Sequence, residues 1–169
     1  MRKEYGNMDQ KPHHGETHYN LRIKIITVSS TRTSETDESG NILEKRFERY
    51  STSRSIVRDD PVQILSELFR DFNEFDAFVY NGGTGVSRYD LTSVTIRKVS
   101  DKEVPGFGEI FRRRSEDQAG IFAYMSSADL FIVFGKPVFV LPGSPKAQDI
   151  GADIILDMID HIIYETRKE

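Results

Sequence analysis

Three segments rich in glycine and hydroxyl residues, each following an apolar run, carry the groups that bind phosphate. They are STRTSETDESG at 30–40, NGGTGVSRYD at 81–90 and PGSP at 142–145. Glycine in a loop costs stability unless the backbone needs positive φ or close approach by a ligand. Backbone N–H groups in such turns and at helix N-termini suit phosphate or carboxylate oxygens. The segments therefore predict an anionic ligand.

Three aspartates lie in or beside these segments: Asp37, Asp59 and Asp90. Phosphates repel nearby carboxylates unless a cation lies between them, and Mg²⁺ takes one or two carboxylates together with phosphate oxygens and waters. This combination predicts a site for a metal and a nucleotide. Each aspartate alone could instead cap a helix or form a turn, so the metal interpretation depends on the three coming together.

Several common sites are disfavoured. The chain contains no Gly-Lys-Ser/Thr, so there is no P-loop, and no dinucleotide-binding glycine pattern follows the first predicted strand. Ser144 lacks the residues of a nucleophile elbow, and His161 falls late in the last predicted helix, which argues against a catalytic triad. The run 112–114 of three arginines could hold a phosphorylated substrate, although a solvated helix face is favoured.

Length and composition indicate one domain without a general affinity for nucleic acid. The chain has 169 residues, 30% of them charged, a net charge of −4 and no cysteine. No apolar run is long enough to cross a bilayer, so we expect a cytoplasmic protein that binds neither membrane nor nucleic acid. Residues 1–20 are polar and predict a disordered tail. Its His13, His14 and His18 are interpreted as solvated rather than metal-binding.

The elements that position the loops alternate along residues 21–169, which we predict to form a single domain. Predicted strands are 21–29, 54–58, 75–80, 130–134 and 137–141. Predicted helices are 39–50, the segment after Asp59-Asp60-Pro61, 90–99, 106–128 and the segment after Ser144-Pro145. This order favours a three-layer α/β fold with a mostly parallel sheet, helices on both faces and right-handed crossovers. Ligands of such sheets bind beyond the carboxyl ends of the strands, so the three loops should converge.

Four stretches in this order resemble the MoaB/MogA family of molybdenum cofactor biosynthesis, which includes the plant Cnx and animal gephyrin G domains. They are TVSSTRTSETDESG, NGGTGVSRYDLT, DKEVPGFGEIFR and LPGSPKA, and the resemblance runs from Leu21 to about Ile163. It implies a MogA-like fold that binds molybdopterin. It also implies a homotrimer, with a hexamer as the alternative, and hand-over of product to a metal-insertion protein. Apolar residues within 119–134 would supply subunit contacts, or would simply be core.

The resemblance implies an Mg-ATP-dependent molybdopterin adenylyltransferase, with ATP as co-substrate and molybdenum or tungsten as the eventual metal. The terminal phosphate of molybdopterin would attack the α-phosphate of ATP and release pyrophosphate. By position, Asp59 and Asp90 correspond to the family's catalytic acids, and Asp37, Asp59 and Asp90 would hold Mg²⁺. The implied substrate- and nucleotide-binding residues are Ser29, Gly82, Gly83, Thr84, Gly85, Pro142, Gly143, Ser144 and Pro145.

Two residues depart from the family pattern. Asn81 stands where the family has Thr or Ser, and Ser127 stands where it has Arg, which removes an anion contact unless Arg88 or Lys136 replaces it. These departures keep two other functions open. One is a pterin-binding or scaffold protein without catalysis, and the other is a nucleotide pyrophosphatase of the CinA type.

Overall fold

The computed structural model describes residues 19–168. The predicted tail lies outside this range except for Tyr19 and Asn20. The backbone N–H of Tyr19 donates to Asp160 Oδ1 at 3.3 Å, and the Arg167 guanidinium lies 5.5 Å from the centre of the Tyr19 ring. Tyr19 therefore packs against the last helix.

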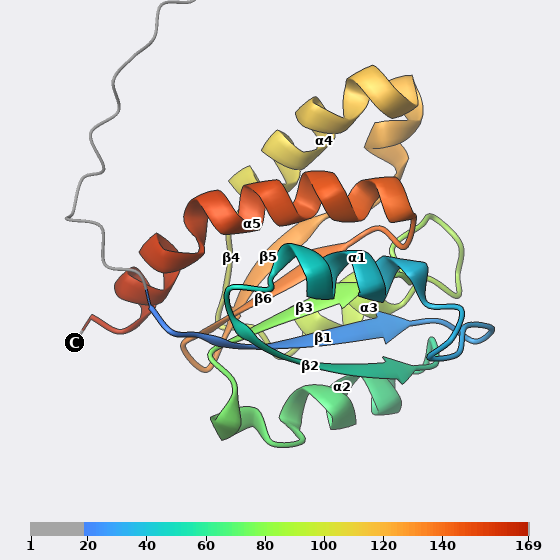
Figure 1. Ribbon diagram of the computed structural model, residues 1–169. Helices are drawn as coiled ribbons and strands as arrows, with labels where there is room; N and C mark the ends of the chain where they lie inside the picture. The colour runs from blue at the N-terminus through green and yellow to red at the C-terminus, as the bar shows by residue number, and fades with distance from the viewer. Residues whose placement is uncertain (1–18, 169) are drawn as a thin grey trace, which may run out of the picture.

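One sheet crosses the described residues, in the strand order β2-β1-β3-β6-β5-β4 (Figure 1). β2, β1, β3 and β6 are parallel, as the alternation of strands and helices predicted. The strands are β1 Arg22–Val28, β2 Ser51–Val57, β3 Ala77–Asn81, β4 Lys102–Glu103, β5 Asp129–Val133 and β6 Lys136–Leu141.

β5 pairs with β6 as an antiparallel hairpin, an exception that a mostly parallel sheet allows. Its two-residue turn, Phe134-Gly135, has positive φ at both positions, a backbone that matches the twist of paired antiparallel strands. β4 was not predicted because it has only two residues, both exposed, and pairs antiparallel with β5. Two residues are too few for an alternating pattern.

Helices cover both faces of the sheet, which gives the three predicted layers (Figure 1). Buried side chains of α1, α4 and α5 form one core with β1, and those of α2 and α3 form a second core on the opposite face. The α-helices are α1 Glu38–Arg46, α2 Pro61–Phe69, α3 Thr92–Arg97, α4 Pro105–Ala119 and α5 Pro145–Thr166, with 3₁₀ helices η1 Phe72–Glu74 and η2 Gly120–Met125. None of these helices is long and apolar enough to cross a membrane.

Two helices begin at the predicted cap and proline. Asp60 caps α2 by accepting the Gln63 N–H at 2.9 Å, and Pro61 is the first helical residue. Ser144 takes the extended cap conformation before Pro145, but its hydroxyl makes no hydrogen bond to the first turn of α5. The Ser144 hydroxyl is therefore not used to cap the helix.

The apolar segment 119–134 divides into two parts. Leu130, Phe131, Ile132 and Val133 are buried in the sheet. Four apolar side chains of η2 are instead at least half exposed: Ile121, Phe122, Tyr124 and Met125. The core interpretation therefore holds for β5 and for the buried Ala123 and Ala128, but not for these four side chains.

Candidate functional site

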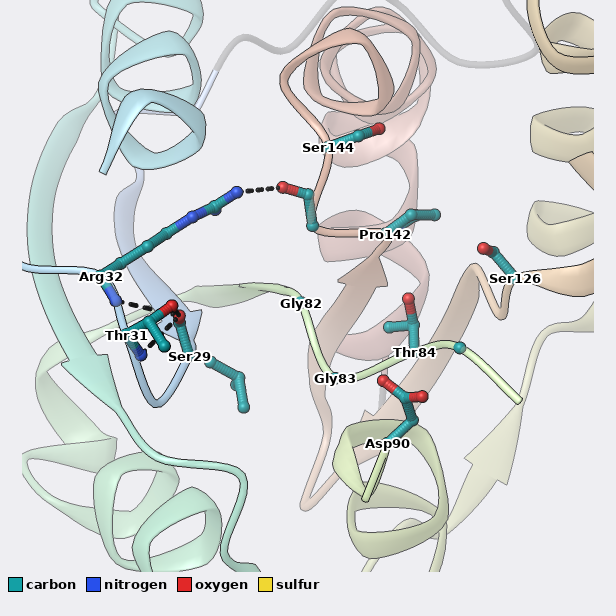
Figure 2. A pocket seen from close by; sticks show the side chains of 13 residues that line it. Ser29, Thr31, Arg32, Gly82, Gly83, Thr84, Asp90, Ser126, Pro142 and Ser144 are labelled. Carbon is teal, nitrogen blue, oxygen red and sulfur yellow. Dashed lines mark hydrogen bonds between the residues drawn. The ribbon is translucent and has the colours of Figure 1, made fainter. Parts of the chain in front are cut away.

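The three predicted loops meet at one cleft of about 490 Å³, beyond the carboxyl ends of β1, β3 and β6 (Figure 2). Its size falls in the range of small-molecule sites. The residues that line it are Val28, Ser29, Thr31, Arg32, Gly82, Gly83, Thr84, Gly85, Asp90, Ser126, Pro142, Gly143 and Ser144. Of the predicted binding residues, only Pro145 is not in this lining, because it begins α5.

The loop after β3 needs glycine at two positions. Gly82 and Gly83 have φ of 97° and 64°, a region that side chains disfavour. A Cβ on Gly82 would collide with the Val28 carbonyl oxygen, and one on Gly83 would collide with Asp59 Oδ1 and Thr92 Oγ1. Thr92 fixes the loop, since its hydroxyl donates to the Gly82 carbonyl at 2.8 Å. Bare backbone is thus presented to the cleft.

Asp59 presents an unsatisfied carboxylate oxygen to this loop. Its Oδ1 is buried and has no hydrogen-bond partner among the described residues. Burial and, secondarily, the charge of Asp90 raise the pKa of Asp59. The neighbouring Asp60 is the helix cap, so Asp59 itself has no capping role. A buried acceptor without a donor, close to a second carboxylate, is an environment that a cation would relieve.

Asp90 lines the cleft and also shapes the loop. Its Oδ2 accepts the Ser87 N–H at 3.0 Å, and a Cβ on Gly85 would lie 2.6 Å from the same oxygen. The turn-forming role considered for Asp90 is therefore present, together with exposure to the cleft.

Asp37 is engaged away from the other two aspartates. It caps α1 by accepting the Gly40 N–H at 3.0 Å, and it also accepts from the Thr27 hydroxyl at 2.7 Å and Arg54 Nη2 at 2.9 Å. Burial raises the pKa of Asp37, but these three hydrogen bonds outweigh it and the pKa lies below its ordinary value. Within residues 19–168, no three acidic or histidine residues cluster closely enough to hold a metal. The structure does not assemble the predicted trio.

Replacing Asp37 with asparagine should lower the free energy of unfolding at pH 7 by roughly 2–4 kcal/mol, because Arg54 and the start of α1 lose a buried charged partner. The wild-type contribution is fully present above the ordinary aspartate pKa of about 3.9. It is lost as pH falls through the lower folded pKa. Urea denaturation at pH 7 and near pH 3 measures the difference. Equal stability of both proteins at pH 7 would contradict the structural role.

Asn81 connects the first and second loops. Its Nδ2 donates to Thr27 Oγ1 at 2.9 Å, and Thr27 in turn donates to Asp37. The residue that departs from the family pattern therefore makes a hydrogen bond between β3 and β1. The amide oxygen, Asn81 Oδ1, is buried without a partner in the described chain.

The cations considered as replacements for an arginine at 127 lie elsewhere. Lys136 begins β6, at the opposite end of the strand from the cleft, and donates to the carbonyls of Phe72 and Phe75. Arg88 is exposed and stacks on Tyr89, 4.7 Å from the ring centre. The cleft instead contains Arg32, which the sequence interpretation did not select. The available signal was that Arg32 is the only basic residue in 29–37.

Comparison with known families settles the relationship. The family described as "Probable molybdopterin binding domain" matches residues 24–161, most of the chain and all three loops. The chain belongs to this family. Similar proteins include "Molybdenum cofactor biosynthesis protein B" of Halalkalibacterium halodurans, which is 35% identical over 96% of this chain and 99% of the relative. "Molybdopterin adenylyltransferase" of Pyrococcus furiosus is 31% identical, over 95% of this chain and 100% of the relative.

Solved structures agree. The "tungsten cofactor synthesizing protein MoaB from Pyrococcus furiosus" is 30% identical and superimposes with a TM-score of 0.81, covering 90% of this molybdopterin-binding chain and 100% of that one. The fold expected from the resemblance is thereby confirmed.

Proposed function

We propose that this molybdopterin-binding domain acts in molybdenum or tungsten cofactor biosynthesis by adenylylating molybdopterin with Mg-ATP. The observation that carries the proposal is the cleft lined by the glycine loop, where Gly83 lies against a buried Asp59 oxygen that has no hydrogen-bond partner among the described residues. A relative with nearly the same length is named a molybdopterin adenylyltransferase, which supports the same activity here.

The reaction needs positioning and neutralisation of charge more than covalent help from the protein. A phosphate oxygen of molybdopterin forms a bond to the α-phosphorus of ATP, and the bond from that phosphorus to the bridging oxygen of pyrophosphate breaks. Backbone at Gly82 and Gly83 lets the phosphates approach closely. The start of α5 at Ser144 offers the positive end of the helix dipole and a hydroxyl that does not cap the helix.

Asp59 and Asp90 fit a magnesium site because hard carboxylate oxygens are its usual ligands and Asp59 Oδ1 has no partner in the described part of the chain. Bound Mg²⁺ would neutralise the phosphate chain. Asp37 would serve by holding the first loop through α1, since its oxygens are already occupied.

The test is to incubate the purified protein with molybdopterin, ATP and Mg²⁺, and to measure pyrophosphate and adenylylated product. Both should form in equal amounts and only when pterin is present. Pterin binding without pyrophosphate release would favour the non-catalytic binding protein. Hydrolysis of ADP-ribose independent of pterin would favour the pyrophosphatase.

We also propose a homotrimer, with the exposed apolar side chains of η2 at the subunit contact. Ile121 and Phe122 are 73% and 69% exposed, an unusual arrangement for adjacent large apolar residues on a monomer. Light scattering should give a mass of about 58 kDa, three times the chain mass of 19.4 kDa.

Phe122→Glu should shift the mass toward that of one chain, because a buried charge opposes the contact. Val62→Glu is the matched control, since Val62 is 71% exposed on α2, on the opposite face of the sheet. A wild-type mass near 19.4 kDa would exclude the trimer.

A further inference from the structure

The cleft has a single positively charged side chain among the described residues that line it, Arg32. The rest of the lining is glycine, hydroxyl and apolar residues, together with the negative Asp90. A nucleotide triphosphate brings several negative charges into this space. Asp59 and Asp90 cannot attract those charges without a metal, so Arg32 is the protein's own counter-charge.

Arg32 is held in place before any ligand arrives. Its Nη2 donates to the Gly143 carbonyl at 2.9 Å, drawn as a dashed line in Figure 2, and its Nη1 lies 3.8 Å from Asp37 Oδ1. Its backbone N–H donates to Ser29 Oγ at 3.2 Å, which fixes the turn. Such contacts lower the entropy lost when the guanidinium binds a ligand.

The Arg32 guanidinium nevertheless retains binding capacity. It has five N–H donors, and within the described chain only one of them makes a hydrogen bond. The side chain is 28% exposed. The planar arrangement of its donors matches two oxygens of one phosphate, which a lysine does not reproduce.

The position of Arg32 separates two ends of the cleft. Figure 2 shows Arg32 reaching toward the loop of Pro142 and Ser144, while Asp90 lies beyond Gly83 and Thr84. The α5 N-terminus at Ser144 adds partial positive charge on the Arg32 side. One end is therefore suited to phosphate directly and the other to a metal.

We infer that Arg32 binds the phosphate chain of the nucleotide, held for this purpose by Gly143 and Asp37. This inference rests on the proposed function, because it assigns a residue to the nucleotide of that reaction. Arg32 thus provides the anion contact that Ser127 cannot, from the first loop rather than from the segment before β5.

The test is calorimetric titration of the protein with ATP and with adenosine, both with Mg²⁺ and without pterin. Arg32→Ala should weaken ATP binding by about 10- to 100-fold, the loss typical of a charge-assisted contact. Adenosine affinity should change less than about twofold, because it carries no phosphate. Arg32→Lys should restore part of the ATP affinity, and it covers the case in which Arg32→Ala unfolds.

Ser39→Ala is the matched control. The Ser39 hydroxyl donates to the same Gly143 carbonyl, at 2.8 Å, without carrying charge. If Arg32 only held the loop, Arg32→Ala and Ser39→Ala would weaken ATP and adenosine binding alike, and the inference would be wrong.

The two proposals can fail separately. Equal ATP affinity of wild type and Arg32→Ala would overturn the phosphate contact and leave adenylylation standing. If Arg32→Ala selectively loses ATP affinity but the wild type forms no adenylylated product, the proposed adenylylation is wrong and the Arg32–phosphate contact is supported.

Discussion

Asp59→Asn should lower kcat/KM for molybdopterin adenylylation by at least about 100-fold, a loss typical of removing one charge-stabilising group from an active site. The asparagine keeps the shape of the side chain beside Gly83 but removes the negative charge that would hold Mg²⁺. Steady-state assays over a range of Mg²⁺ concentrations measure the effect. High Mg²⁺ should recover part of the rate if the carboxylate is a ligand.

The same substitution should make the fold slightly more stable. The pKa of Asp59 is raised in the folded protein, so ionisation of this carboxyl opposes folding above the folded pKa. That destabilisation disappears as pH falls below the ordinary value of about 3.9. Asp59→Asn should therefore be slightly more stable than wild type at pH 7, with a small gain because the side chain is partly exposed, and equally stable near pH 3.

Asp60→Ala provides the control for Asp59→Asn. Asp60 is the adjacent carboxylate and caps α2, so its loss should cost about 1 kcal/mol of stability. Its effect on kcat/KM should stay within about threefold, because its carboxylate caps α2, whereas the Asp59 carboxylate lies against Gly83 of the glycine loop. Full activity of Asp59→Asn, or equal losses from both variants, would refute the assignment.

The convergence of the three loops was predictable from the sequence because parallel strands end at one edge of a sheet. The β5–β6 hairpin follows from the two residues between the strands, which are too few for a crossover, although the positive φ of Phe134 in the turn was not predictable. β4 was not predictable, because its two exposed residues give no alternating pattern.

Individual roles within the site were harder to predict than its location. Asp59 and Asp60 are chemically identical neighbours, and only the backbone determines which one caps α2. Asp37 is a residue type that can bind a metal, but its oxygens are occupied by Thr27 of β1 and Arg54 of β2. Nothing in the sequence around Asp37 indicates these two partners. Arg32 was missed because one arginine among polar loop residues looks like a solvated charge until Gly143 is placed beside it.

Gly83→Ala should reduce adenylylation by at least about 100-fold through geometry alone, since small misplacements at a reacting centre have effects of this size. The new methyl group would occupy the space of Asp59 Oδ1 and Thr92 Oγ1, and φ of 64° disfavours any side chain. The carboxylate must then move away from the loop, or the loop away from the carboxylate. Either movement separates the Gly83 backbone from the Asp59 carboxylate, and the reaction needs both in place.

Gly106→Ala tests whether this result is specific. Apart from its chain neighbours and the backbone of its own helix, no described atom lies within 4 Å of a Cβ at Gly106, in the first turn of α4, so alanine should leave activity unchanged and suit the helix. The strained φ should also lower the free energy of unfolding of Gly83→Ala by about 1–3 kcal/mol, which urea denaturation measures. Asp59→Asn is expected to stabilise the fold and Gly83→Ala to destabilise it. If both lose activity, the loss is therefore caused by the changed site and not by a change in stability. An active Gly83→Ala would show that the loop does not need to approach its ligand closely.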